Sequence, residues 1–166
     1  MKKGEMLIYP TESSYAIGCR YDDAATIQKI MELKGRVDDR FTLVADSLQQ
    51  VKDTFPFSAE QEALAKQYWP GALSIVVSDQ FAVRVPDKLL TREIAMKTGV
   101  PVLATSLNVS GEFPRYYLNE LPDKFKDIPT INIGILPMHP PSTVVECIDG
   151  KVVIHRQGAV KLKGHY

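Results

Sequence analysis

Asp149 and Gly150 stand between two runs of alternating apolar residues, "STVVECI" and "KVVIHR". An Asp-Gly pair in this setting is the strongest short-range signal for a two-residue hairpin, because both residues tolerate the positive φ angles of a type I′ turn. The runs "ALSIVVS" and "FAVRV" indicate a second hairpin across "SDQ". Two hairpins argue against a purely parallel sheet, and this constrains the fold more than any other feature of the sequence.

Strand-like and helix-like patterns alternate along the rest of the chain. A helix capped by Asp22 or Asp23 carries Ile27, Ile30, Met31 and Lys34 at helical spacing and is expected to end at Gly35. The other predicted strands are "EMLIY", "FTLVA", "VLATS" and "TINI", and the other predicted helices cover residues 46–55, 58–69 and 87–98. The pattern predicts a mixed α/β fold with a twisted, mixed or largely antiparallel sheet and flanking helices.

Composition narrows the class of protein. The 166 residues can bury one sizeable core, and we expect one domain over residues 1–166. Twenty basic and twenty acidic residues give zero net charge, so no basic tail or polyanion scaffold is indicated. Cys19 and Cys147 lie far apart and are expected to be reduced thiols. No apolar run approaches the length of a membrane span, so we expect a soluble, cytoplasmic protein with no membrane partner.

Several familiar active sites have no counterpart in the sequence. There is no Walker loop, dinucleotide fingerprint, C-x-x-C pair or H-E-x-x-H motif, and we expect no bound metal site. The histidines His139, His155 and His165 are scattered, and His155 in a strand-like run is more often a packing or surface residue than a ligand. Ser106 lies in "ATSLNVSG", which lacks the nucleophile elbow of serine hydrolases.

Polar residues gather where predicted strands and helices end, which is where open α/β sheets place ligand sites. They are Thr11, Glu12, Ser13, Tyr15, Lys34, Arg36, Arg40, Arg84, Ser106, Asn108, Ser142, Thr143 and Arg156.

Each of these residues also has a simpler interpretation. Three cations at a helix end complement the helix dipole, and such residues are usually a solvated terminus. Ser106 and Asn108 are common turn formers. Arg84 is different, because it stands between Val83 and Val85 in an apolar strand and needs an anion or a carboxylate beside it.

Ordered motifs along nearly the whole chain resemble those of the YrdC-like family, which includes bacterial L-threonylcarbamoyladenylate synthase. "YPTESSYAIGC" is similar to the opening motif of the family, and "LKGR" resembles its K-x-R motif. The other matching words, in family order from about residue 6 to residue 160, are "WPGAL", "AVRVP", "ATSLNVSG", "PSTVVE" and "HRQGAV".

The resemblance implies a twisted α/β sheet around a concave, positively charged cavity. Family members condense ATP, L-threonine and bicarbonate into L-threonylcarbamoyl-AMP and pyrophosphate, with Mg²⁺ expected, and the product is used with t6A-transfer proteins to modify tRNA. The resemblance also implies that Lys34 and Arg36 act on the ATP phosphates and are the catalytic residues. The threonine site would comprise Thr11, Ser13, Arg84 and Ser142, and the remaining nucleotide contacts would be Arg40, Ser106, Asn108 and Arg156.

The sequence also departs from the family pattern. Arg40 replaces a second lysine, Leu107 replaces an alanine, and "IGILPMHPP" replaces a glycine-rich loop. Several words look more like the YciO branch of the family. The alternative is therefore a YciO-like protein that binds a nucleotide or double-stranded RNA in the same cavity with weak or no synthase activity. The structural alternative for Arg84 is a salt bridge to one of the protein's own acids, such as Glu12.

Overall fold

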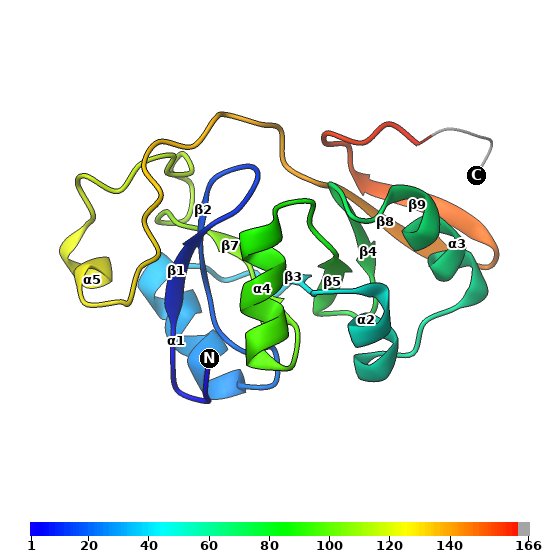
Figure 1. Cartoon of the computed structure of the whole chain (residues 1–166), viewed down its shortest axis with the longest axis horizontal. Helices are drawn as coiled ribbons and strands as arrows, with labels where there is room; N and C mark the ends of the chain where they lie inside the picture. The colour runs from blue at the N-terminus through cyan, green and yellow to red at the C-terminus, as the bar shows by residue number, and fades with distance from the viewer. Residues whose placement is uncertain (163–166) are drawn as a thin grey trace.

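The computed structural model describes residues 1–162, in which the strands form two sheets (Figure 1). The smaller sheet is antiparallel and has the order β1-β2-β7, with β1 Leu7–Pro10, β2 Tyr15–Gly18 and β7 Thr105–Ser106. The larger sheet is mixed and has the order β6-β3-β5-β4-β8-β9. Its strands are β3 Phe41–Val44, β4 Leu73–Val76, β5 Phe81–Arg84, β6 Val102–Leu103, β8 Thr143–Ile148 and β9 Lys151–Arg156.

Three of the described helices begin at side-chain caps, and the first ends at the glycine that the sequence predicts. Asp23 caps α1 (Ala24–Lys34), and Gly35 closes it in the left-handed conformation with φ 61°. Ser58 and Gln61 form a capping box at the start of α3 (Ala59–Tyr68). The remaining helices are α2 Leu48–Thr54, α4 Leu89–Thr98 and α5 Asp123–Lys126.

The mixed α/β fold with a mixed sheet and flanking helices is confirmed, and so are both hairpins. Strands β4 and β5 pair antiparallel, as do β8 and β9. Asp149 and Gly150 have φ angles of 50° and 74°, as a turn with two positive φ angles requires. The prediction for "TINI" is wrong, because Thr130 makes only an isolated bridge to Ile8 and the residues after it form no strand. The pattern did not reveal β2 or α5.

The segment "VLATS", predicted as one strand, contributes a short strand to each of the two sheets. Its first part, β6, pairs with β3 of the larger sheet, and its second part, β7, pairs with β2 of the smaller sheet. Near this junction the Leu103 amide donates to the Cys19 carbonyl at 2.9 Å. The chain therefore joins the two sheets by passing from one to the other within five residues.

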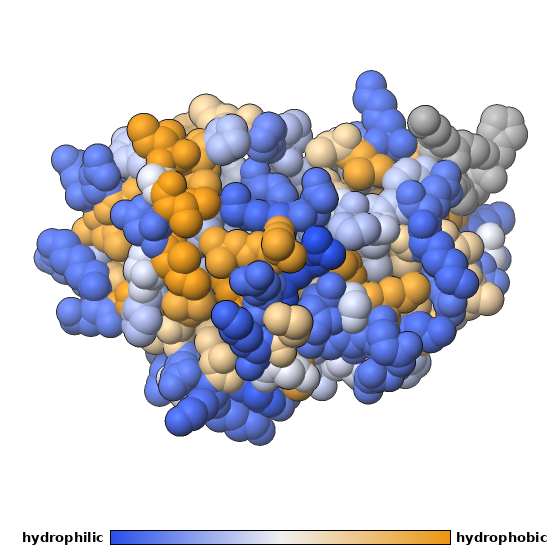
Figure 2. Space-filling model, viewed as in Figure 1, coloured by the Kyte–Doolittle hydropathy of each residue, from blue (hydrophilic) through white to orange (hydrophobic). Residues whose placement is uncertain are grey.

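Helix α4 packs where the sheets meet. Its Ile94 and Ala95 share a buried cluster with Tyr9 and Ala16 of the smaller sheet and Val44 of the larger one. Figure 2 shows apolar residues gathered over the half of this face that carries β1 and α4. Leu89 and Met96 of α4 are exposed. The helix thus holds the relative position of the two sheets.

Residues 129–141 cross the top of Figure 1 from the smaller sheet to β8. Cys19 is buried and Cys147 is partly buried, and both are free thiols. None of the described helices is both long and apolar enough to span a membrane. His165 lies outside the described residues.

Candidate functional site

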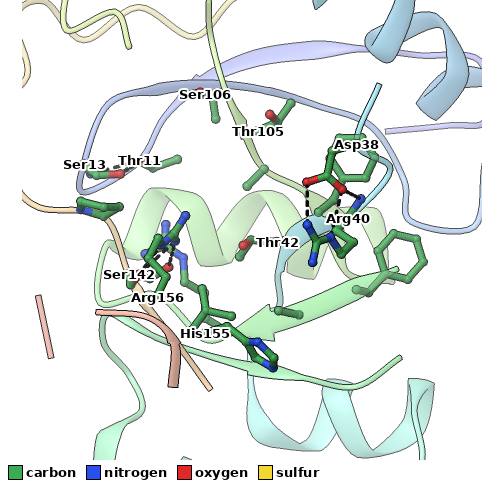
Figure 3. Close-up of a pocket in the computed structure, with 18 of the residues that line it drawn as sticks. Thr11, Ser13, Asp38, Arg40, Thr42, Thr105, Ser106, Ser142, His155 and Arg156 are labelled. Atoms are coloured by element: carbon green, nitrogen blue, oxygen red, sulfur yellow. Dashed lines mark hydrogen bonds and ion pairs between the residues drawn. The ribbon is translucent and has the colours of Figure 1, made fainter. Parts of the chain in front are cut away.

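A cavity of about 710 Å³ is lined by side chains from both sheets and from the segments that cover them. Thr11 and Ser13 reach it from the β1–β2 turn, and Thr42 and Arg84 reach it from the larger sheet. Figure 3 shows Arg40 and Asp38 to one side of Thr42, and Ser142 and Arg156 to the other. The cavity therefore has two ends, each with arginine side chains.

Arg36 and Arg40 form the first end. The Arg36 guanidinium lies 4.5 Å from the centre of the Phe41 ring, and its Nη1 donates to Thr105 Oγ1 at 3.3 Å. Burial lowers the pKa of Arg36 from its ordinary value. Asp38 binds Arg40 through two side-chain hydrogen bonds of 3.0 and 3.2 Å, and these lower the pKa of Asp38. Because this ion pair is exposed, an incoming anion can displace Asp38 at small cost.

Arg84 and Arg156 form the second end. Arg84 is almost fully buried, and its Nη2 lies 3.1 Å from Glu12 Oε2. Arg156 donates to the Ser142 carbonyl at 3.0 and 2.9 Å and to Ser142 Oγ at 3.0 Å. Burial, followed by repulsion from Arg84, lowers the pKa of Arg156. The ion pair expected as the structural alternative for Arg84 is thus present, while Arg84 also faces the cavity.

Hydroxyl groups accompany the second end. Thr11 Oγ1 donates to the Ser14 carbonyl at 2.8 Å, and the Thr11 and Ser13 hydroxyls are 3.4 Å apart. Ser142 Oγ accepts from Ser74 Oγ at 2.9 Å. Their positions are fixed by the turn and by the strand, so they can orient a polar ligand beside Arg84.

Gly158 allows the close packing that places Ser142. A Cβ atom on Gly158 would lie 2.1 Å from the Pro141 carbonyl oxygen. The "RQGA" segment therefore packs directly against residues 141 and 142 because residue 158 has no side chain.

Lys34 and Asn108 do not line the cavity. Lys34 is 2% exposed, and its Nζ donates to the carbonyls of Ser106 and Asn108 and to Asn108 Oδ1. Each of the three N–H groups thus has a protein acceptor. Burial, with smaller contributions from Arg36 and Lys124, lowers the pKa of Lys34 to about 8. In this structure Lys34 holds the segment that presents Ser106, whereas the family resemblance implies that it acts on the ATP phosphates.

A histidine–glutamate pair in the cavity was not expected from the sequence. His155 Nε2 lies 2.6 Å from Glu146 Oε2, and both side chains line the cavity. Val144 pairs with Arg156 and Val145 with Ile154, so a β-bulge occurs at residue 155. The bulge lets the consecutive residues His155 and Arg156 both face the cavity. Alternation along the strand could not have indicated this.

The segment that replaces the glycine-rich loop is anchored by hydrogen bonds. The Leu136 amide donates to the Tyr116 carbonyl, and the Tyr15 hydroxyl donates to the Gly134 carbonyl, both at 2.8 Å. Its residues His139 and Pro141 line the cavity. The altered loop thus forms part of the cavity wall.

Comparison with known proteins supports the resemblance seen in the sequence. The family model Sua5_yciO_yrdC, described as telomere recombination, matches residues 1–158. A threonylcarbamoyl-AMP synthase of Vibrio parahaemolyticus is 33% identical over 144 residues, which are 76% of this chain and 78% of that protein. One of Bacillus subtilis is 27% identical over 180 residues, covering 96% of this chain and 51% of that protein.

Two solved structures share the fold. The P. abyssi Sua5 structure complexed with L-threonine superposes with a TM-score of 0.82 at 26% identity, covering 93% of this chain and 51% of that chain. The structure of E. coli YciO has a TM-score of 0.76 at 24% identity, covering 96% of this chain and 86% of that chain, and at this identity it shows the fold alone. The chain therefore spans about half the length of some relatives and most of the length of others.

Proposed function

The chain belongs to the Sua5/YciO/YrdC family, and from this premise we propose that it is an L-threonylcarbamoyladenylate synthase. The observation that carries the proposal is the two-ended cavity, with Arg36 and Arg40 at one end and Arg84 at the other. ATP supplies phosphates for the first end, and L-threonine supplies a carboxylate for the second. The curated relatives are named for this activity, and the P. abyssi relative was crystallised with L-threonine.

The chemistry requires alignment more than a protein nucleophile. The amine of threonine and bicarbonate give N-carboxythreonine with loss of water, and an oxygen of the new carbamate group attacks the α-phosphorus of ATP. The bond from that phosphorus to the bridging oxygen breaks, and pyrophosphate leaves. Arg36 and Arg40, which line the cavity, would stabilise this charge, and holding both reactants together lowers the entropic part of the barrier.

Mg²⁺ enters this proposal as part of the MgATP substrate. Within residues 1–162 no three His, Cys, Asp or Glu side chains lie together as ligands for a metal. Mg²⁺ is commonly held by substrate phosphates and one or two carboxylates. The ion would neutralise charge on the leaving pyrophosphate. The threonylcarbamoyl group would then pass to a separate t6A-transfer protein that acts on tRNA.

We expect the protein to release pyrophosphate from MgATP only when L-threonine and bicarbonate are both present. A coupled pyrophosphate assay, with each substrate omitted in turn, measures this directly. Release that does not depend on threonine contradicts the synthase proposal, as does no release.

The second candidate is a nucleotide- or RNA-binding protein without efficient turnover. The observation that favours it is the placement of Lys34 and Asn108 behind the cavity wall, which leaves fewer polar groups for ATP. Nucleotide binding without pyrophosphate release would support this candidate.

Replacing Arg84 by lysine is expected to raise the threonine requirement at least tenfold, which is about 1.4 kcal/mol or more. Lysine keeps the charge next to Glu12 but loses the planar fork that binds a carboxylate through two hydrogen bonds. The measurement is the threonine dependence of pyrophosphate release, with ATP affinity as the control. If Arg84→Lys lowers only the melting temperature, Arg84 belongs to the fold and not to the threonine site.

A further inference from the structure

We propose that Glu12 reserves the Arg84 end of the cavity for a single carboxylate group and keeps phosphate away from it. Glu12 then determines which end of the cavity takes which substrate. The identity of the carboxylate, that of threonine, rests on the proposed function. The exclusion of phosphate rests on the charges of the site.

Glu12 lies behind Arg84 and not in the cavity. Its neighbours Thr11 and Ser13 line the cavity, whereas Glu12 points toward the segment after β5. Its Oε1 accepts from the Asp87 amide at 3.1 Å, and its Oε2 lies 3.1 Å from Arg84 Nη2. The side chains of Glu12 and Arg84 are 22% and 6% exposed, so water screens this pair only weakly.

Glu12 balances the charge of Arg84 by a single close contact, between its Oε2 and Nη2. Oε2 of Glu12 and Nε of Arg84 are buried and have no hydrogen-bond partner. No side-chain N–H of Arg84 takes part in a hydrogen bond within residues 1–162. The contrast is Asp38, which accepts two side-chain hydrogen bonds from Arg40. Because Arg84 Nε is buried, a ligand in the cavity can be bound only through the Nη groups, on a guanidinium whose charge Glu12 already balances.

The balance matters because a second guanidinium is close. Arg84 is near enough to depress the pKa of Arg156, and Arg156 has no ion pair within the described residues. With Glu12 in place, the three side chains carry a net charge of about +1, which suits one carboxylate. Without the Glu12 charge they would carry about +2, and paired guanidinium groups with that charge bind phosphate strongly.

Exclusion of phosphate from this end prevents a reversed complex. The cavity presents arginine at both ends, so a triphosphate could otherwise enter with its phosphates beside Arg84 and Arg156. ATP bound in that direction would occupy the threonine site. The charge of Glu12 makes this orientation unfavourable, because Glu12 is partly buried and is held by the Asp87 amide. At the other end Asp38 also pairs with Arg40, but that pair is exposed, so an entering phosphate can displace Asp38.

The test uses Glu12→Gln, which removes the charge and keeps an oxygen to accept from the Asp87 amide. Inorganic phosphate is titrated by calorimetry into the wild type and the variant. We expect the variant to bind one phosphate more than the wild type. In a second titration, phosphate should raise the apparent Kd for L-threonine at least tenfold in Glu12→Gln and less than about twofold in the wild type.

Glu62→Gln is the matched control, because it also removes the charge of an ion-paired carboxylate. Glu62 pairs with Lys52 and Lys66 outside the cavity. This control should behave as the wild type does. Glu12→Asp, which keeps the charge, should exclude phosphate again. Glu12→Ala serves as a second neutral variant if Glu12→Gln proves unfolded in its melting curve.

An unchanged phosphate count in folded neutral variants overturns the inference. The two proposals fail in different ways. A wild type that binds no L-threonine rejects the proposed function, yet the additional phosphate in Glu12→Gln still tests the role of Glu12. A wild type that binds L-threonine, with variants that gain no phosphate, leaves the function standing and removes Glu12 from it.

Discussion

Replacing Gly18 by alanine is expected to lower the free energy of unfolding by about 3 kcal/mol or more. A Cβ atom on Gly18 would lie 1.7 Å from the Leu103 carbonyl oxygen and 2.9 Å from its carbon. Both are backbone atoms, and the Leu103 amide is itself bonded to the Cys19 carbonyl, so the strands must separate. Overpacking typically costs about 1 to 3 kcal/mol when the neighbouring side chains can move aside. Here the added atom meets the backbone of Leu103, which cannot move without shifting the strand. Denaturant unfolding measures the loss.

Gly134→Ala is the control for this prediction. Gly134 has a φ of 88°, but an added Cβ would meet no atom within 4 Å. Its cost comes from backbone conformation alone and should be about 1 kcal/mol. If both variants lose the same free energy of unfolding, the close approach of Gly18 to Leu103 does not determine the cost of the Gly18→Ala substitution.

Lys34→Met is expected to lower the free energy of unfolding by about 3 kcal/mol, because it removes a charged donor and leaves the carbonyls of Ser106 and Asn108 without it. The segment from Ser106 to Asn108 should become less ordered. Chemical denaturation gives the stability, and hydrogen exchange of the amides in this segment gives the local effect.

Arg36→Met is the comparison variant, because Arg36 lies two residues away and lines the cavity. It should weaken nucleotide binding by about 1.5 to 3 kcal/mol, the range for hydrogen bonds to charged groups, with a smaller change in stability. If Lys34→Met instead keeps its stability and loses nucleotide affinity, Lys34 contacts phosphate directly in the complex.

Local patterns predicted the parts of the fold that local interactions determine. The caps of α1 and the Asp149-Gly150 turn each depend on residues within one turn of chain, and the structure has both. The prediction for "TINI" failed because an apolar run can form a strand only where a partner continues alongside it. Thr130 bridges Ile8, and the chain then leaves the sheet.

The contacts of the site residues were harder to predict from the sequence than the fold was. Lys34 shares its spacing with the buried Ile27 and Ile30, and this was a signal that it faces inward. The resemblance to the K-x-R motif implies that Lys34 acts on a phosphate. A motif cannot show that the carbonyls of Ser106 and Asn108 lie within hydrogen-bond reach of Lys34 Nζ. The bulge at His155 also depends on long-range register, which periodicity does not contain.

The division of residues 102–106 between the two sheets has a consequence for how the protein acquires its structure. During synthesis β1 and β2 can pair at once across a short turn, whereas β3 must wait for β5 and β6. Strand β4 acquires β8 only after a further 66 residues, from Val76 to Thr143, have been added. Closing such long loops slows folding, because their entropy is lost before the contacts form. The wall that carries Ser142 and Arg156 is consequently completed last, when nearly the whole described chain has been made.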